Sequence, residues 1–347
     1  MAVNACKSVE REHQQEPAVP VSIIIPAKNE GKVIAECLDA LSRTDYPPDA
    51  REVILVDNGS TDETVAVASR YADRLNLRII TGQKGYISAV RNRGALMATG
   101  QILAFLDADC APPPDWLQRG ASLCTPGRIT GAYYAIPSRS SWVARSWYGD
   151  QHREKDGPVP FIPSGDLFVD RETFLKVGGF DETIETNEDC DFSERARAAG
   201  FEIIAYPELA VTHYGTPQAL SGFYKKQRWH GKHVIAVTVR DLSAFRNFRA
   251  VAFALYTFLC MAAIAIGAGM ALLTGGFGVL LAAAAGLILA PLALAARRCW
   301  RRKRPGDVFP LAVLFLVYGL ARARCLLDIK TVFGRDRLGP LLRAGSD

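Results

Sequence analysis

Residues 102–110 read ILAFLDADC, an unbroken apolar run that ends in two carboxylates. A short apolar run of this kind is typical of a strand buried on both faces of a sheet. Asp107 and Asp109 are two positions apart, so in an extended segment their side chains share one face. The stretch therefore predicts a central strand that delivers two acids to a single point.

Three similar runs precede this strand, namely VSIIIP at 21–26, EVILV at 52–56 and LRIIT at 77–81. Helical patterns separate them. One covers residues 33–41, a second is expected to open at the capping-box pair Ser60 and Glu63, and a third covers residues 87–98. Strands and helices that alternate at these lengths predict an α/β fold with a mostly parallel sheet.

Polar residues follow the predicted strands directly. Ala27-Lys28-Asn29-Glu30 follows the first, Asp57-Asn58-Gly59 the second and Asp107-Ala108-Asp109 the fourth. Ligands of parallel sheets bind beyond the carboxyl ends of the strands, so we expect these segments to meet at one site.

The pair of acids after the fourth strand has a chemical interpretation. Two carboxylates on one face suit Mg²⁺ or Mn²⁺ held together with diphosphate oxygens, and the cation would neutralise a leaving diphosphate. Turns also produce Asp-x-Asp, but the position of Asp107 and Asp109 after a buried strand favours the functional interpretation.

Two further acidic segments each allow two interpretations. Asp57 could serve as a turn and helix cap, or it could accept hydrogen bonds from a nucleobase or ribose. Glu188-Asp189-Cys190-Asp191 opens a helix, where acids favour the helix dipole. Three acids in four residues exceed what the dipole needs, so one of them could be a general base that deprotonates an acceptor hydroxyl.

The N-terminal part of the chain is expected to form one domain over residues 21–235. Residues 111–235 are irregular, with helical patterns at 171–177 and 189–199 that end in glycines, and they complete the same site. Residues 1–20 form a polar tail without the features of a signal peptide. The eight cysteines are scattered without CxxC spacing, which indicates free thiols in a reducing compartment.

The C-terminal part has the composition of a membrane domain, predicted for residues 250–330. Two apolar segments, 250–273 and 277–296, are each long enough to span a bilayer and form a hairpin. A candidate third segment covers residues 308–327, but its apolar run is interrupted at Arg322. It could span, re-enter or lie in the interface.

Basic residues predict how this domain is oriented. A basic linker at 236–249 precedes the hairpin. A basic run follows it, because six of the eight residues from Arg297 to Arg304 are Lys or Arg, and a basic tail covers 331–347. The positive-inside rule places both hairpin ends in the cytoplasm. A full third span would put the tail outside, so a tilted or interfacial third segment is favoured. We expect a multi-pass inner-membrane protein with a cytoplasmic catalytic domain, bound to lipid and not to nucleic acid.

Five segments together resemble family 2 glycosyltransferases. They are SIIIPAKNE (22–30), VDNGSTDET (56–64), SAVRNRGALMATGQILAFLDADC (88–110), GDLFVDRETFLKVGGFDET (165–183) and NEDCDFSERARAAGF (187–201). Their order and spacing resemble those of the family. The resemblance implies the Rossmann-like A-type glycosyltransferase fold, a nucleotide-sugar donor and a Mn²⁺ or Mg²⁺ ion.

The resemblance also implies roles for individual residues. Asp189 matches the catalytic base of the Glu188-Asp189 motif, which implies inversion at the anomeric carbon. Asp107 and Asp109 match the metal-binding Asp-x-Asp, and His213 matches a further metal ligand of some relatives. Positions that match the donor site are Pro26, Ala27, Glu30, Asp57, Arg91 and Asp107.

Two departures from the family pattern stand out. Lys225-Lys226-Gln227-Arg228-Trp229 is similar to the Gln-x-x-Arg-Trp of processive polysaccharide synthases, but Lys225 replaces the Gln. Arg228 and Trp229 are still expected on the acceptor and diphosphate side, although this stretch could instead be a basic face on lipid headgroups. Asp166 stands near the expected acceptor position, where many relatives have a small or amide residue.

These observations predict a hexosyltransferase-type enzyme that transfers one sugar to a glycan or lipid-linked acceptor in glycan or polysaccharide biosynthesis. Two enzyme alternatives remain: a polyprenyl-phosphate sugar transferase, which needs no base, and a processive polysaccharide synthase. A transport or scaffold protein with a degenerate domain would have lost part of the Asp-x-Asp or the base, and both are present here. A nucleotidyltransferase would need a more Gly-rich loop than PAKNEGK.

Overall fold

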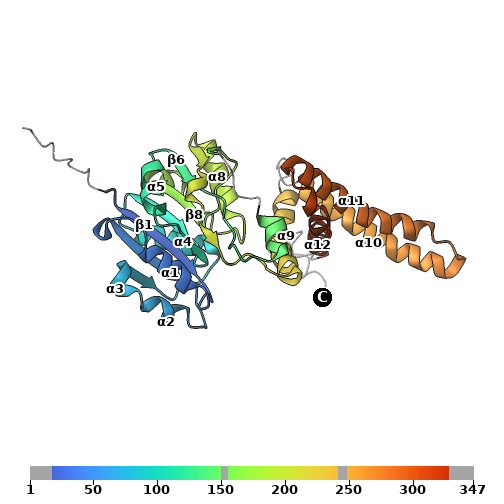
Figure 1. Cartoon of the computed structure of the whole chain (residues 1–347), viewed down its shortest axis with the longest axis horizontal. Helices are drawn as coiled ribbons and strands as arrows, with labels where there is room; N and C mark the ends of the chain where they lie inside the picture. Colours follow the sequence, from blue (N-terminus) through green and yellow to red (C-terminus); the bar gives the residue numbers. More distant parts are fainter. Residues whose placement is uncertain (1–17, 150–154, 241–247, 328–347) are drawn as a thin grey trace, which may run out of the picture.

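The computed structural model describes residues 18–149, 155–240 and 248–327. It has a broad α/β part and a long helical hairpin that projects from one side of it (Figure 1). Most of the predicted tail 1–20, residues 241–247 of the predicted linker and the predicted tail 331–347 lie outside the described residues.

A twisted sheet forms the centre of the α/β part, in the strand order β3-β2-β1-β4-β8-β6-β9-β7. The four predicted strands are adjacent and parallel, whereas β8 pairs antiparallel with both β4 and β6, and β7 with β9. The expected α/β fold with a mostly parallel sheet is therefore confirmed. The strands are β1 (Val21–Ala27), β2 (Arg51–Asp57), β3 (Leu77–Ile80), β4 (Ile102–Leu106), β6 (Arg128–Gly131), β7 (Gly157–Pro158), β8 (Asp166–Asp170) and β9 (Glu202–Ala205).

Alternate residues of the central strands enter two separate cores. In β1, Ile23 and Ile25 belong to the core that includes α1, whereas Ile24 belongs to the core that includes α4. A strand with apolar contacts on both faces needs the continuous apolar run seen in its sequence. The helices around the sheet are α1 (Ile34–Ser42), α2 (Thr64–Ser69), α3 (Ala72–Leu75), α4 (Ile87–Met97), α5 (Trp116–Leu123), α6 (Trp142–Tyr148), α7 (Arg171–Val177) and α8 (Glu188–Ala198), with short 3-10 turns η1 (Pro48–Ala50) and η2 (Pro207–Leu209).

The capping box predicted at Ser60 is wrong. Helix α2 begins at Thr64, and the Ser60 hydroxyl accepts a hydrogen bond from the Asn29 N–H, at 2.9 Å. Asp62 accepts from the Thr64 N–H and from the Gly31 N–H, each at 3.0 Å. The polar residues of this loop thus hold the loop after β1 in place, a tertiary role that competes with helix capping.

A second, two-stranded sheet lies beside the end of β4. Its strands β5 (Cys110–Ala111) and β10 (Thr212–His213) pair antiparallel, with His213 opposite Cys110. This pairing joins residues that are about a hundred positions apart in the sequence. It places His213 next to the two acids that follow β4.

Helices α9 to α12 form the C-terminal part. Helix α9 (Leu220–Arg240) runs through the domain boundary predicted at residue 235. Helices α10 (Phe248–Thr274) and α11 (Gly278–Arg302) form the hairpin, and α12 (Val308–Leu326) follows the turn η4 (Pro305–Asp307). All three of α10, α11 and the segment Pro305–Leu326 are long and apolar enough to cross a membrane.

Helix α12 crosses the base of the hairpin. Leu311 packs with Ala295 and Cys299 near the end of α11. Two turns later, Gly319 lies against Thr257 and Phe253 near the start of α10. The two contacts fall at a similar height on the hairpin, so α12 runs across it at the side of the α/β part (Figure 1).

Candidate functional site

A cavity of about 920 Å³ opens beyond the carboxyl ends of β1, β2 and β4. This is the edge of the sheet at which the polar segments were expected to meet. The predicted site residues that line it are Pro26, Glu30, Arg91, Asp107, Asp109, Glu188, Asp189, His213 and Trp229. Lys28, Asn58 and Lys226 come from the same quoted segments, and lining residues outside those segments include Tyr134, Ser164, Thr216 and His230.

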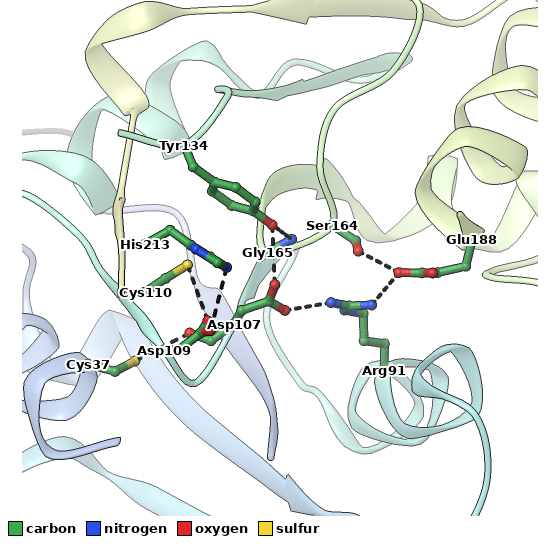
Figure 2. A network of polar contacts seen from close by, with 10 residues as sticks. All are labelled: Cys37, Arg91, Asp107, Asp109, Cys110, Tyr134, Ser164, Gly165, Glu188 and His213. Carbon is green, nitrogen blue, oxygen red and sulfur yellow. Dashed lines mark hydrogen bonds and ion pairs between the residues drawn. The ribbon is translucent and has the colours of Figure 1, made fainter. Parts of the chain in front are cut away.

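Arg91 joins the two acidic motifs at the floor of this cavity. Its Nη2 lies 2.5 Å from Oδ1 of Asp107, and its Nη1 lies 2.6 Å from Oε1 of Glu188 (Figure 2). The Ser164 hydroxyl donates a second hydrogen bond to the same Glu188 oxygen, at 2.9 Å. Arg91 is enclosed, which makes this bridge between α4, β4 and α8 a rigid part of the site.

Asp107 is held in one orientation as a carboxylate. The Tyr134 hydroxyl lies 3.2 Å from its Oδ2 and accepts a hydrogen bond from the Gly165 N–H, at 3.1 Å (Figure 2). Burial alone would raise the pKa of Asp107, but the charges of Arg91 and His213 and the hydrogen bonds from Arg91 and Tyr134 together outweigh it and hold the pKa below its usual range. Asp107 is therefore negatively charged at neutral pH.

The ligand atoms of Asp107, Asp109, Cys110 and His213 all lie within 4.8 Å of one another. His213 Nδ1 lies 3.0 Å from the Thr216 hydroxyl, which leaves Nε2 facing Asp109 Oδ2 at 3.5 Å. The Tyr134 ring stacks on the imidazole with centroids 4.7 Å apart, so the ring plane is fixed.

This donor set fits a divalent cation. Two carboxylates and an imidazole nitrogen suit Mn²⁺, and the two carboxylates also suit Mg²⁺. Burial, followed by the charges of Asp107 and Asp109, raises the pKa of Cys110 well above its usual value. The pairing of β5 with β10 brings in His213, which the sequence motif could only suggest.

Glu188 and Asp189 lie at the start of α8 but have different surroundings. Glu188 is occupied by Arg91 and Ser164, whereas Asp189 accepts the Cys190 N–H at 2.7 Å and lines the cavity. Burial, together with the neighbouring Glu188 charge, raises the pKa of Asp189 to about 7. Asp189 can therefore exchange a proton near neutral pH.

Only some of the residues predicted to bind the donor in the loops after β1 and β2 line the cavity. Pro26 and Glu30 line the cavity, and burial followed by the charges of Asp109 and Asp107 raises the pKa of Glu30 to about 7. Ala27 and Asp57 are buried and are not among the lining residues. The Asp57 carboxylate accepts the N–H groups of Gly59 and Ser60, which supports its interpretation as a turn residue. Asn58 is the residue of that loop that lines the cavity.

Asp166, which we predicted near the acceptor, is not among the residues that line the cavity. It is fully buried, where its carboxylate accepts hydrogen bonds from Trp116 Nε1 at 2.9 Å and from the Val211 N–H at 3.4 Å. Burial raises its pKa well above the usual value. The side chain ties strand β8 to α5 and to the segment before β10, so we assign it a structural role.

Arg228 is not among the described residues that line the cavity, whereas Trp229 is. Arg228 is exposed, and the cavity-lining residues of α9 are Lys226, Trp229 and His230. Positions 226, 229 and 230 share one helical face, and position 228 lies on another. The spacing Lys-x-x-Trp-His was the available signal, but only the packing of α9 shows which face meets the cavity.

Comparisons with known proteins agree with this architecture. Residues 22–180 match the sequence model of Glycosyl transferase family 2. Glycosyltransferase AglE of Haloferax volcanii is 32% identical over 241 residues, covering 67% of this chain and 78% of that protein. Beta-monoglucosyldiacylglycerol synthase of Synechocystis sp. is 26% identical over 232 residues, covering 61% of this chain and 47% of that protein.

A solved structure extends the likeness to most of the chain. Mannosyltransferase PcManGT from Pyrobaculum calidifontis, in complex with GDP-Man and Mn²⁺, aligns with a TM-score of 0.57. The alignment covers 90% of this chain and 88% of that chain at 21% identity, and therefore supports the shared fold. The family model and the match to Glycosyltransferase AglE show that this chain belongs to glycosyl transferase family 2.

Proposed function

We propose that this enzyme transfers a sugar from a nucleotide-sugar donor to an acceptor hydroxyl at a membrane surface, with inversion at the anomeric carbon. The observation that carries the proposal is the double ion pair of Arg91 with Asp107 and Glu188. It joins the predicted metal motif to the predicted base motif around one cavity. A donor and an acceptor could therefore meet between them.

The donor half of the cavity has the groups that a nucleoside diphosphate needs. Pro26, Glu30 and Asn58 would contact the nucleoside, and Asp107, Asp109 and His213 would hold a divalent cation. When bound, the cation would neutralise the negative charge of the leaving diphosphate. Lys226 lies on the same side of the cavity and would add a positive charge beside that leaving group.

Asp189 would act as the base on the acceptor side. The acceptor hydroxyl passes its proton to Asp189 while its oxygen bonds to the anomeric carbon and the bond from that carbon to the diphosphate breaks. The hydrogen bonds of Glu188 to Arg91 and Ser164 keep that carboxylate in place beside Asp189. Burial, together with the charge of Glu188, raises the pKa of Asp189 to about 7, which suits a base near neutral pH.

The membrane part suggests where the acceptor lies. The α10–α11 hairpin would span the bilayer, and the basic residues at its base would place the catalytic domain on the cytoplasmic face. Helix α12 crosses the base of the hairpin, which favours a tilted or interfacial position. Such a position keeps the basic C-terminal residues on the same side, in agreement with the charge rule.

A hydrolysis assay with a panel of nucleotide-sugars tests this proposal. Protein in detergent should release nucleoside diphosphate slowly from one donor, and only with Mn²⁺ or Mg²⁺. Asp109→Ala should lose metal-dependent donor binding, whereas Asp189→Asn should retain binding and lose transfer. Normal transfer by Asp189→Asn would instead support a polyprenyl-phosphate acceptor that needs no base. No turnover with any donor would contradict the proposed function.

A further inference from the structure

A second cavity, of about 410 Å³, lies at the base of the hairpin. We call it the arginine groove, because five arginines and one leucine line it and no carboxylate of the described residues does. Its lining residues are Arg249 at the start of α10 and Leu294, Arg297, Arg298, Arg301 and Arg302 in the last turns of α11.

The arginine groove is adjacent to the catalytic cavity. Arg302 lines both of them, so the two spaces meet at one side chain. Arg298 donates a hydrogen bond to the Trp147 carbonyl oxygen at 2.8 Å, and its guanidinium lies 5.1 Å from the centre of the Trp147 ring. This contact attaches the end of α11 to helix α6 of the catalytic part. The position of the groove relative to the site is therefore set by direct packing.

The composition of the groove indicates the ligand chemistry. Five guanidinium groups in a small space make the arginine groove strongly positive, so it attracts an anion. Their planar, forked donors match phosphate oxygens, and basic pockets beside membrane helices bind phosphate head groups. Leu294 lies one turn further along α11 toward the apolar part of the hairpin, where a lipid chain would continue.

We infer that the arginine groove binds the phosphate or diphosphate of a lipid-linked saccharide, whose sugar hydroxyl reaches Asp189 in the catalytic cavity. The inference rests on the proposed function and specifies its acceptor. The phosphate stays bonded to lipid and sugar throughout, and the reacting hydroxyl lies further along the same molecule. This separation explains why the basic groove and the base are in adjacent cavities joined at Arg302.

Binding of an isoprenoid diphosphate tests the groove without any need for turnover. The wild type in neutral detergent should bind geranylgeranyl diphosphate at least tenfold more tightly than geranylgeraniol. The double variant Arg297→Gln/Arg301→Gln should lose that preference. Lys303→Gln is the matched control, because Lys303 belongs to the same basic run but does not line the groove.

Two outcomes would overturn the inference. One is equal binding of the diphosphate and the alcohol by the wild type. The other is that the wild type binds phosphatidylglycerol vesicles more tightly than the isoprenoid diphosphate and the double variant binds neither. The groove would then hold the head groups of ordinary lipids.

Donor hydrolysis separates this inference from the proposed function. Lys303→Gln should hydrolyse the donor at the wild-type rate, because Lys303 lines neither the arginine groove nor the catalytic cavity. If the wild type hydrolyses no donor while diphosphate binding still depends on the two arginines, the proposed function fails and the groove remains a phosphate site.

Discussion

The Nη2 atom of Arg91 lies 2.5 Å from Oδ1 of Asp107, in an ion pair that joins helix α4 to the end of strand β4. Only 3% of the Arg91 surface is exposed, so water screens this pair very little. The pair keeps Asp107 ionised and orients it before any ligand binds. It also couples the metal motif to Glu188, the second partner of the same guanidinium.

Replacement of Arg91 by lysine should damage both stability and function. A single ammonium cannot replace the fork that contacts Asp107 and Glu188, so one buried carboxylate loses its partner. We expect a loss of about 1–3 kcal/mol in the free energy of unfolding. Donor hydrolysis should fall with it. Denaturant unfolding measures the first effect, and exposed Arg93→Lys is the control and should be neutral.

The activity should depend on pH through Asp189. Because its pKa is raised to about 7, the base form is scarce below that pH, and kcat/KM for transfer should rise through pH 7 and level off above it. Asp189→Asn should remove both the transfer and this rise. A rate that stays constant between pH 6 and pH 8 would contradict the assignment.

The same carboxyl should make stability depend on pH in the opposite direction. An acid with a raised pKa binds its proton more tightly in the folded state, so the wild type loses stability as the pH rises from 4 through 7. Asp189→Asn should remove the part of this loss that Asp189 causes, whereas the part from Glu30, whose pKa is also raised to about 7, should remain. Thermal unfolding of both proteins at pH 4 and at pH 8 measures the effect. The melting temperature of the variant minus that of the wild type should be higher at pH 8 than at pH 4.

His213 should set the affinity and the preference for the cation. His213→Ala removes a nitrogen donor and should weaken Mn²⁺ binding by about 10–100-fold, as loss of a ligand or its orientation typically does. His213→Asp, which offers an oxygen, should shift the preference toward Mg²⁺. Electron paramagnetic resonance of Mn²⁺ measures the binding directly. Unchanged Mn²⁺ affinity in both variants would show that His213 is not a ligand.

The positive charge of Lys226 beside the leaving group can be tested with Arg228 as the matched control. Lys226 lines the cavity, whereas Arg228 is exposed on another face of α9. Lys226→Gln should lower kcat/KM for the donor by about 10–100-fold, since it removes a preorganised positive charge. Arg228→Gln should stay within about twofold of the wild type. The reverse result would restore the role that the sequence pattern assigned to Arg228.

Much of the fold was predictable because its signals are local. The run ILAFL has the composition of a strand buried on both faces, and β4 occupies such a place. The position of Asp107 and Asp109 after it follows from strand geometry alone. Ser60 shows the limit, because its hydroxyl contacts Asn29, 31 positions away, in place of the helix start.

Asp166 and Arg228 were both predicted beside the acceptor, and neither is among the residues that line the cavity. Asp166 ends a turn beside the site, yet its side chain points into the core, where Trp116 and Val211 donate to it. Arg228 and Lys226 are two positions apart on a helix, so about 200° of rotation separates them. Which side of a helix or strand meets a cavity depends on the packing partner, and no local pattern encodes that partner.

The sequence by itself determined the order of the first four strands and the helices between them, the two acids that follow β4, the acids that open α8 and the apolar hairpin. These follow from periodicity and from spacing within a few residues. Only the tertiary structure decided that Arg91 joins Asp107 to Glu188, that His213 lies beside Asp109 and that Arg302 lines two cavities. Such contacts join residues that are distant in the chain, and they form because the sheet, α9 and α11 pack in one arrangement.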